Sequence, residues 1–119
     1  MSKKVLIVDD SNYMRTLIKD TLKEEGYEIV GEAPNGETAI DLAMELKPDL
    51  MTLDNILPDM VGNDIIKIIK DEGLKTKVVV ISAVGQQSVV NEGMEYGASD
   101  YIVKPFTPED LVEVVNRLF

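Results

Sequence analysis

The sequence predicts an α/β fold in which a parallel β-sheet is covered by helices on both faces. Short apolar runs alternate five times with longer stretches whose apolar residues recur at helical spacing, the pattern of consecutive βα units. Right-handed crossovers place the helices of such units on both sides of one sheet. The chain has 119 residues and no linker rich in Pro, Gly or Ser, so we expect one domain over residues 1–119.

The predicted strands are short and differ in apolar character. Val5–Val8 is a continuous run of branched apolar residues, as expected of a strand buried on both faces. Glu28–Ala33 is less apolar and partly alternating, which suits an edge of the sheet. The remaining strands are predicted at Leu50–Leu53, Val78–Ile81 and Tyr101–Val103.

The predicted helices follow the strands. Their apolar residues recur at helical spacing within Met14–Leu22, Ala39–Met44, Ile65–Ile69, Val89–Met94 and Leu111–Leu118. Ser11 supplies an N-cap for the first helix, and Gly97 lies just past the end of the fourth. Thr107 and Pro108 begin the last helix with a capping hydroxyl and a proline at the first helical position.

The composition excludes several classes of function. The chain has 22 Asp and Glu against 12 Lys and Arg, a formal charge of −10 at pH 7, and neither His nor Cys. This excludes imidazole bases, thiolate chemistry, disulfides and the usual zinc sites. The acidity argues against a nucleic-acid-binding surface. No apolar stretch is long enough for a signal peptide or a membrane span, so we expect a cytoplasmic protein that contacts no membrane.

Polar side chains collect where the predicted strands end. They are Asp9 and Asp10, then Asp54, Ser82 and Lys104. Because parallel sheets bind ligands outside the carboxyl ends of their strands, we expect three carboxylates, a hydroxyl and an ammonium to meet at one rim. A single polar residue at a strand end is usually a cap or a solvated turn, but four strand ends of this kind favour a functional site.

The chemistry of this rim suggests phosphoryl transfer. Three close carboxylates repel one another unless a cation neutralises them, and oxygen ligands favour a hard cation such as Mg²⁺. Lys104 and Ser82 suit the opposite side of a phosphoryl group, whose transfer depends on positioning and charge neutralisation. Without His or Cys, the natural covalent acceptor is a carboxylate, which would form an aspartyl phosphate.

Five motifs in the correct order resemble the receiver domain of response regulators, in particular its stand-alone chemotaxis regulators. They are Val8–Asp10, Leu53–Asp54, Leu57–Gly62, Ile81–Ala83 and Val103–Phe106. The resemblance covers essentially the whole chain. It implies a flavodoxin-like, doubly wound α/β fold with five helices and a five-stranded parallel sheet in the order 2-1-3-4-5.

The resemblance also implies which residues act on the phosphoryl group. Asp54 would be the phosphoacceptor, and Asp10, Asp54 and the backbone carbonyl of Ile56 would bind Mg²⁺ directly. Asp9 would act mainly through metal-bound water. Lys104 would pair with the phosphoryl group.

Two further residues would carry the response. Ser82 would hydrogen-bond a phosphoryl oxygen and move toward it on activation, and Tyr101 would swing inward as Ser82 moves. Tyr101 could instead be a half-exposed packing residue of its strand. The resemblance further implies a cis peptide bond between Lys104 and Pro105.

Four residues depart from the family pattern or tune it. Asn55 follows the phosphoacceptor where the family usually has an apolar residue, and Val61 precedes Gly62 where Asp or Asn is common. Ile56 and Val84 occupy variable positions that flank the acceptor. Both are apolar and cannot orient an attacking water, so we expect slow hydrolysis of the phosphoryl group.

We therefore expect a phosphorylation-switched signalling protein of a two-component system and not an enzyme in the usual sense. A histidine kinase of the chemotaxis type would phosphorylate Asp54, and the altered surface would bind a motor-switch or adaptor protein to control chemotaxis. A phosphatase could also bind. The chain ends directly after its last helix, so we expect no effector domain. A monomer is expected for one small acidic domain.

Three other readings stay open at this point. The chain could be a phosphorelay intermediate, which would pass its phosphoryl group to a second histidine protein. It could be a small Mg²⁺-dependent hydrolase of the aspartyl-phosphate kind, although no inserted segment would form a substrate pocket. A flavin-binding electron carrier is disfavoured because acidic strand ends would repel the cofactor phosphate.

Overall fold

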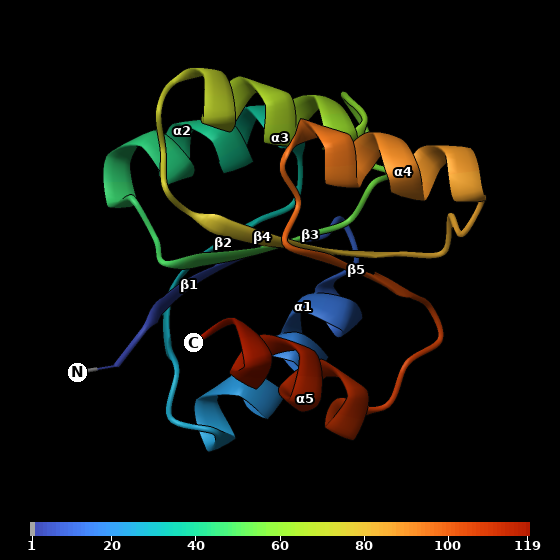
Figure 1. Cartoon of the computed structure of the whole chain (residues 1–119). Helices are drawn as coiled ribbons and strands as arrows, with labels where there is room; N and C mark the ends of the chain where they lie inside the picture. The colour runs from blue at the N-terminus through green and yellow to red at the C-terminus, as the bar shows by residue number, and fades with distance from the viewer. Residues whose placement is uncertain (1) are drawn as a thin grey trace.

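The computed structural model describes residues 2–119 as five strands alternating with five helices (Figure 1). The strands are β1 (Lys4–Val8), β2 (Glu28–Ala33), β3 (Leu50–Leu53), β4 (Lys77–Ser82) and β5 (Asp100–Val103). The helices are α1 (Asn12–Glu24), α2 (Gly36–Leu46), α3 (Gly62–Asp71), α4 (Gln87–Tyr96) and α5 (Pro108–Leu118). All ten predicted elements are present. Ser82, which we expected to follow its strand, is the last residue of β4.

The strands form one parallel sheet in the order β2-β1-β3-β4-β5. The predicted fold class and strand order are confirmed, and β2 lies at an edge as its sequence indicated. Helices α1 and α5 cover one face of the sheet, and α2, α3 and α4 cover the other (Figure 1). Such a doubly wound sheet leaves the carboxyl ends of the strands free to form a site.

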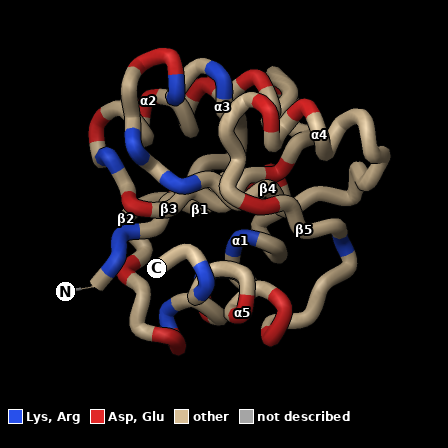
Figure 2. Tube along the Cα trace, viewed as in Figure 1, with Lys and Arg blue, Asp and Glu red and all other residues tan. Residues whose placement is uncertain are grey.

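Each face of the sheet has its own hydrophobic core. In β1, Leu6 and Val8 belong to one core cluster, whereas Val5 and Ile7 belong to the other. All four are buried. Successive side chains of a strand point to opposite faces, so a strand covered on both faces must be apolar at every position. This explains the continuous apolar run that the sequence shows here. Charged residues lie mainly on the helices and at the ends of strands (Figure 2).

The helix ends match the predicted signals closely. The Ser11 hydroxyl accepts from the backbone N–H of Met14 at 3.2 Å, and Thr107 and Asp110 form a reciprocal capping box that begins α5. Gly97 ends α4 in the left-handed conformation, at φ 119°. By contrast, Gln86 at the start of α4 makes no side-chain capping hydrogen bond.

Two further observations complete the fold. The Lys104–Pro105 peptide bond is cis, as the family resemblance implied. Within residues 2–119, no helix has the length and apolar character that a membrane crossing requires.

Candidate functional site at the carboxyl ends of the strands

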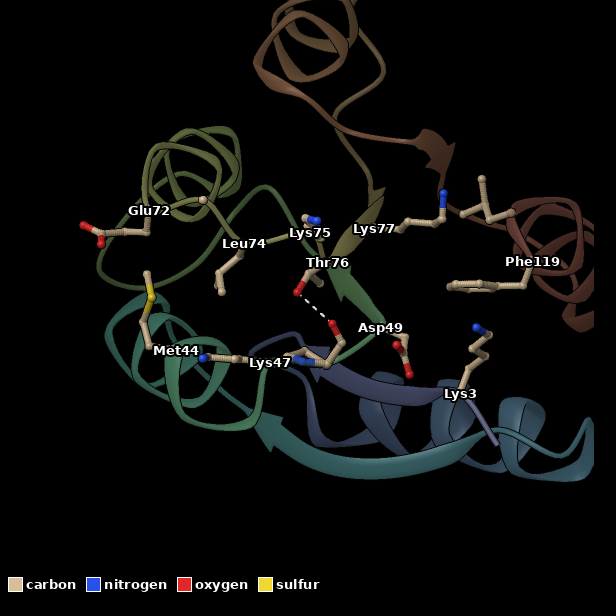
Figure 3. A pocket seen from close by; sticks show the side chains of 13 residues that line it. Lys3, Met44, Lys47, Asp49, Glu72, Leu74, Lys75, Thr76, Lys77 and Phe119 are labelled. Carbon is tan, nitrogen blue, oxygen red and sulfur yellow. Dashed lines mark hydrogen bonds between the residues drawn. The ribbon is translucent and has the colours of Figure 1, made fainter. Parts of the chain in front are cut away.

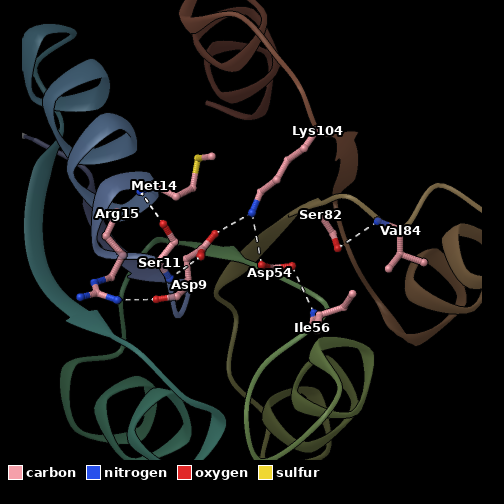
Figure 4. Close-up of polar contacts among 9 residues, drawn as sticks. All are labelled: Asp9, Ser11, Met14, Arg15, Asp54, Ile56, Ser82, Val84 and Lys104. Atoms are coloured by element: carbon pink, nitrogen blue, oxygen red, sulfur yellow. Dashed lines mark hydrogen bonds and ion pairs between the residues drawn. The ribbon is translucent and has the colours of Figure 1, made fainter.

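The sheet brings the predicted site residues to one rim. Strand register aligns Val8 with Leu53 and pairs Ser82 with Val103. The residues that follow these positions therefore emerge at the same level, Asp9 after β1, Asp54 after β3 and Lys104 after β5. Figure 4 shows Lys104 reaching from β5 to Asp9 and Asp54, with Ser82 on the β4 side of Asp54.

Three carboxylates form the centre of this rim. One oxygen from each of Asp9, Asp10 and Asp54 lies within 4.8 Å of the others. Asp9 and Asp54 are 1% and 7% exposed, whereas Asp10 faces solvent. Carboxylates this close repel one another, and burial of two of them strengthens the repulsion. Their oxygens are the donors that hard divalent cations prefer, and the exposed Asp10 leaves room for coordinated water, so the residues fit an Mg²⁺ site.

Lys104 provides positive charge within the described site. Its Nζ lies 2.9 Å from Asp9 Oδ2 and 3.2 Å from Asp54 Oδ2. Burial by itself lowers the pKa of Lys104, but the hydrogen bond to Asp9 and the charges of Asp54 and Asp9 outweigh it, so the pKa lies above its ordinary value. The ammonium is therefore charged at neutral pH and partly offsets the carboxylate repulsion.

The backbone and Arg15 fix Asp9. Asp9 Oδ1 accepts from the backbone N–H of Ser11 at 2.9 Å, and Arg15 Nη1 donates to the Asp9 carbonyl at 2.6 Å. Arg15 in turn pairs with Glu32 of β2, with Nε 3.2 Å from Oε1. Our sequence analysis did not single out Arg15. Its position four residues after the N-cap Ser11 places it on the first turn of α1, which faces the rim.

Asp54 is held by the loop that follows it. Its Oδ1 accepts from the backbone N–H of Ile56 at 3.1 Å, while its Oδ2 faces Lys104. The loop folds back so closely that a Cβ at Gly62 would lie 2.5 Å from the Asp54 carbonyl oxygen. Glycine is therefore required at this position. The Ile56 side chain is 58% exposed beside Asp54.

Ser82 and Tyr101 meet through the β4–α4 loop. The buried Ser82 hydroxyl accepts from the backbone N–H of Val84 at 3.3 Å. The Tyr101 hydroxyl donates to the Val84 carbonyl at 2.6 Å and accepts from Asn55 Nδ2 at 3.2 Å. The half-buried Tyr101 thus points toward the site and is bonded to two of its loops.

Two polar residues have structural roles that the sequence analysis missed. Asn55, noted there as a departure from the family pattern, is 2% exposed and its side chain is hydrogen-bonded at both ends. Asp59 accepts from the backbone N–H groups of Gly36 and Glu37, which begin α2. These bonds lower the pKa of the Asp59 carboxyl. The signal for Asn55 was its polarity at an apolar position, and Asp59 gave no local signal.

Two cavities differ in their distance from the site. One of about 800 Å³ lies at the opposite end of the sheet. Lys3 and Lys77 hold their Nζ atoms 5.3 and 5.9 Å from the centre of the Phe119 ring there, and Lys47 and Lys75 line another part of the cavity (Figure 3). It contains none of the predicted site residues. A smaller, apolar cavity of about 370 Å³ opens beside Asp54. It is lined by Asn55, Ile56, Leu57, Met60, Val61, Val84 and Val89.

Comparison with known proteins gives a consistent result. The family model described as the response regulator receiver domain matches residues 5–116. The chemotaxis protein CheY of Thermotoga maritima is 48% identical over 118 residues, covering 99% of this chain and 98% of the relative. The transcriptional regulatory protein SrrA of Staphylococcus aureus is 42% identical over 118 residues, which are 99% of this chain and 48% of that protein.

Solved structures agree with these relatives. CheY in the CheX-CheY-BeF3-Mg complex from Borrelia burgdorferi superposes with a TM-score of 0.95 at 30% identity, covering 98% of this chain and 89% of that chain. The Vibrio cholerae chemotaxis protein CheY4 superposes with a TM-score of 0.92 at 30% identity over the full length of both chains.

Proposed function

Because the chain belongs to the response regulator receiver domain family, we propose that it is a phosphorylation-switched signalling protein whose phosphoacceptor is Asp54. The observation that carries this proposal is the contact of Lys104 with Asp54 within the cluster of three carboxylates. The cluster supplies an acceptor and metal ligands, and Lys104 supplies a cation. We further propose that residues 1–119 form one receiver domain, since both hydrophobic cores pack on a single sheet.

Transfer would proceed from a phosphohistidine on a kinase. A carboxylate oxygen of Asp54 attacks phosphorus, the phosphorus–nitrogen bond breaks, and its electron pair returns to the imidazole of the kinase. When bound by Asp10, Asp54 and the carbonyl of Ile56, with Asp9 contributing through water, Mg²⁺ would neutralise charge on the phosphoryl oxygens. Lys104 would move from its bonds with carboxylates to an ion pair with the phosphoryl group.

Spontaneous hydrolysis of the phosphoryl group would be slow. Hydrolysis requires a water aligned behind the phosphorus, and the side chains of Ile56 and Val84 that flank the acceptor offer no hydrogen bond to such a water. The chain would thus act as a phosphoacceptor that assists its own phosphorylation and dephosphorylation, with slow release in the absence of a phosphatase.

The response would pass through Ser82 and Tyr101. A phosphoryl oxygen gives the Ser82 hydroxyl a stronger acceptor than any neutral partner. Movement of Ser82 would displace Val84, whose carbonyl binds the Tyr101 hydroxyl. The output surface would then consist of α4, β5 and α5. In α4 Met94 is 42% exposed among polar residues, so this helix offers one apolar side chain to a partner.

We propose chemotaxis as the process controlled, with a motor-switch or adaptor protein as the target. Identity of 48% to a chemotaxis protein over nearly the whole length of both chains supports this assignment. A cytoplasmic monomer that binds neither nucleic acid nor membrane would suit the role, and the net charge of −10 disfavours both polyanions and anionic lipid surfaces.

The kinase assignment is tested by phosphotransfer. A purified chemotaxis-type histidine kinase, radiolabelled on its histidine, is mixed with the chain in Mg²⁺ or in EDTA, and with Asp54→Asn as a control. We expect rapid transfer of label to the chain in Mg²⁺ only, and no transfer to the variant. Failure of transfer from the kinase, when small phosphodonors do label the chain, would contradict the kinase assignment. Onward transfer to a second histidine protein would instead identify a phosphorelay.

A further inference from the structure

Asn55, in the loop after β3, is hydrogen-bonded to two other elements, α3 and β5. Its backbone carbonyl accepts from the N–H of Gly62 at 2.8 Å, and its side-chain Oδ1 accepts from the N–H of Asn63 at 2.8 Å. Its Nδ2 donates to the Tyr101 hydroxyl at 3.2 Å. The residue directly after Asp54 therefore bonds both to the start of α3 and to β5.

The contact with Tyr101 completes the bonding of that hydroxyl. A tyrosine hydroxyl has one proton to donate, and Tyr101 donates it to the Val84 carbonyl at 2.6 Å. Its oxygen remains an acceptor, which Asn55 Nδ2 uses. Because the Val84 N–H also donates to Ser82, a continuous chain of hydrogen bonds joins Ser82, Val84, Tyr101 and Asn55.

Asn63 extends this chain to α4. Its side chain is fully buried, and its Nδ2 donates to the Val89 carbonyl and to Glu92 Oε1, both at 3.1 Å. A Cβ at Gly93 would lie 2.8 Å from Asn63 Oδ1, so glycine permits α4 to pack closely here. The start of α4 lacks a side-chain cap, and these hydrogen bonds from Asn63 attach α4 to α3.

We propose that Asn55 is a positioning residue that holds Tyr101 in its inward orientation and, through Asn63, couples that orientation to α4. This rests on the proposed function, in which Asp54 accepts the phosphoryl group. An apolar residue at position 55 would offer Tyr101 no hydrogen bond. In this chain the inward tyrosine is already satisfied without a phosphoryl group, so Asn55 shifts the resting equilibrium of the output surface toward the inward arrangement.

A purely structural role for Asn55 makes a different prediction. The start of α3 has no side-chain cap at Val61, and Asn55 bonds the N–H groups of Gly62 and Asn63 in its place. If capping were its entire role, removal of the Asn55 side chain would break the bond to Asn63, lower the stability of the chain and leave the orientation of Tyr101 unchanged. The test must therefore observe Tyr101 directly.

Fluorine NMR of the full chain labelled with fluorotyrosine provides that observation. The chain has four tyrosines, and single Tyr→Phe substitutions assign their resonances. Without a phosphodonor, we expect Asn55→Leu to lower the ratio of inward to outward Tyr101 about three- to tenfold, the effect of losing one neutral hydrogen bond. An unchanged Tyr101 resonance in a folded Asn55→Leu variant would overturn the proposal.

A matched pair elsewhere in the chain serves as a control. The Tyr27 hydroxyl donates to Oδ1 of the exposed Asn116 at 2.7 Å. We expect Asn116→Leu to shift the Tyr27 resonance and leave that of Tyr101 in place. A Tyr101 resonance that responds equally to Asn116→Leu would show that its shift in Asn55→Leu is non-specific and would overturn the proposal.

A second measurement covers the case in which Asn55→Leu does not fold. In Tyr101→Phe, the Asn55 Nδ2 proton that bonds the Tyr101 hydroxyl loses its acceptor. We expect the hydrogen exchange of that proton to accelerate about tenfold or more relative to the unsubstituted chain, since a bonded amide exchanges only on opening. Unchanged exchange would contradict the proposal.

Acetyl phosphate and Mg²⁺ are then added to the unsubstituted chain to test the proposed function separately. Absence of an adduct would contradict the proposed function, whereas the response of Tyr101 is recorded without phosphodonor and fails or succeeds separately.

Discussion

At the scale of single residues, the site gathers three carboxylates whose mutual repulsion Lys104 offsets only in part. Asp9, Asp10 and Asp54 offer oxygens within 4.8 Å of one another, and Lys104 contacts two of the three residues. The remaining negative charge favours a divalent cation at this position, and it destabilises the chain when no cation neutralises it.

Removing one carboxylate should therefore stabilise the metal-free protein. We predict that Asp10→Asn raises the free energy of unfolding in EDTA by about 1 kcal/mol, the repulsion of two charges at this separation in a water-like medium. The same variant should lose the stabilisation that Mg²⁺ gives the unsubstituted chain. Urea unfolding with and without Mg²⁺ measures both effects. Asp41→Asn, an exposed site on α2, is the matched control, and an Asp10→Asn variant no more stable than this control would contradict the prediction.

The lifetime of the phosphoryl group belongs to the same scale. We predict that Ile56→Asn or Val84→Glu speeds spontaneous hydrolysis by roughly tenfold, or about 1.4 kcal/mol in the barrier, because a polar side chain there can orient water. Intact mass followed over time after removal of the phosphodonor gives the rate. An unchanged rate in both variants would show that these positions do not control hydrolysis in this protein.

At the scale of elements, helices are anchored from distant parts of the chain as well as by their own caps. Asp59, in the loop after β3, accepts from Gly36 and Glu37 at 2.7 and 3.0 Å and so caps α2 from 22 to 23 residues away in sequence. It adds to Asn35, which caps α2 locally. The loop that carries Ile56 is thereby tied to α2.

This cap has a predictable pH dependence. Hydrogen bonds from Gly36 and Glu37 lower the pKa of Asp59 in the folded chain, so the stability it contributes is present above the unfolded pKa, near 4, and is lost as pH falls through the folded value. We predict that Asp59→Asn is less stable than the unsubstituted chain at pH 7 and that the difference shrinks below about pH 4.

Urea unfolding across this pH range measures the difference. Asp41→Asn again serves as the control, and its stability difference from the unsubstituted chain should vary less with pH. If the difference for Asp59→Asn does not shrink on acidification, the capping role of the ionised carboxylate is wrong.

The same scale separates what the sequence could predict from what it could not. The apolar run Val5–Val8 and the cap at Thr107 depend on neighbouring residues, and the structure confirms both. The roles of Asp59 and Asn55 depend on partners brought close by folding, Gly36 and Tyr101. Periodicity carries no information about such contacts, so these roles became visible only in the structure.

At the scale of the whole molecule, the strand order decides which residues meet. Periodicity alone predicted a parallel sheet, while the order came from the family resemblance and is confirmed here. Once β1, β3, β4 and β5 lie side by side, the residues at their carboxyl ends must converge. Asp9, Asp10, Asp54, Ser82 and Lys104 could therefore be predicted from the sequence, because each lies at or beside a strand end, whereas Arg15 lies on α1 and was missed.

The net charge of −10 acts on the molecule as a whole. Self-repulsion destabilises a compact acidic chain, and salt screens it. We predict that raising NaCl from about 0.01 to about 0.15 M, which shortens the Debye length from about 30 to 8 Å, raises the melting temperature by a few degrees. Tetramethylammonium chloride should give the same rise, because screening does not require cation binding. A rise with NaCl alone would instead indicate Na⁺ at the carboxylate cluster.

The central claim is that this chain catalyses its own phosphorylation at Asp54. Intact mass spectrometry after incubation with acetyl phosphate tests it most directly, on the unsubstituted chain and on Asp54→Asn, each with Mg²⁺ and with EDTA. We predict one phosphoryl adduct on the unsubstituted chain in Mg²⁺, and none in EDTA or on the variant. The claim would be contradicted by an adduct of equal yield on Asp54→Asn, or by the absence of an adduct under every condition.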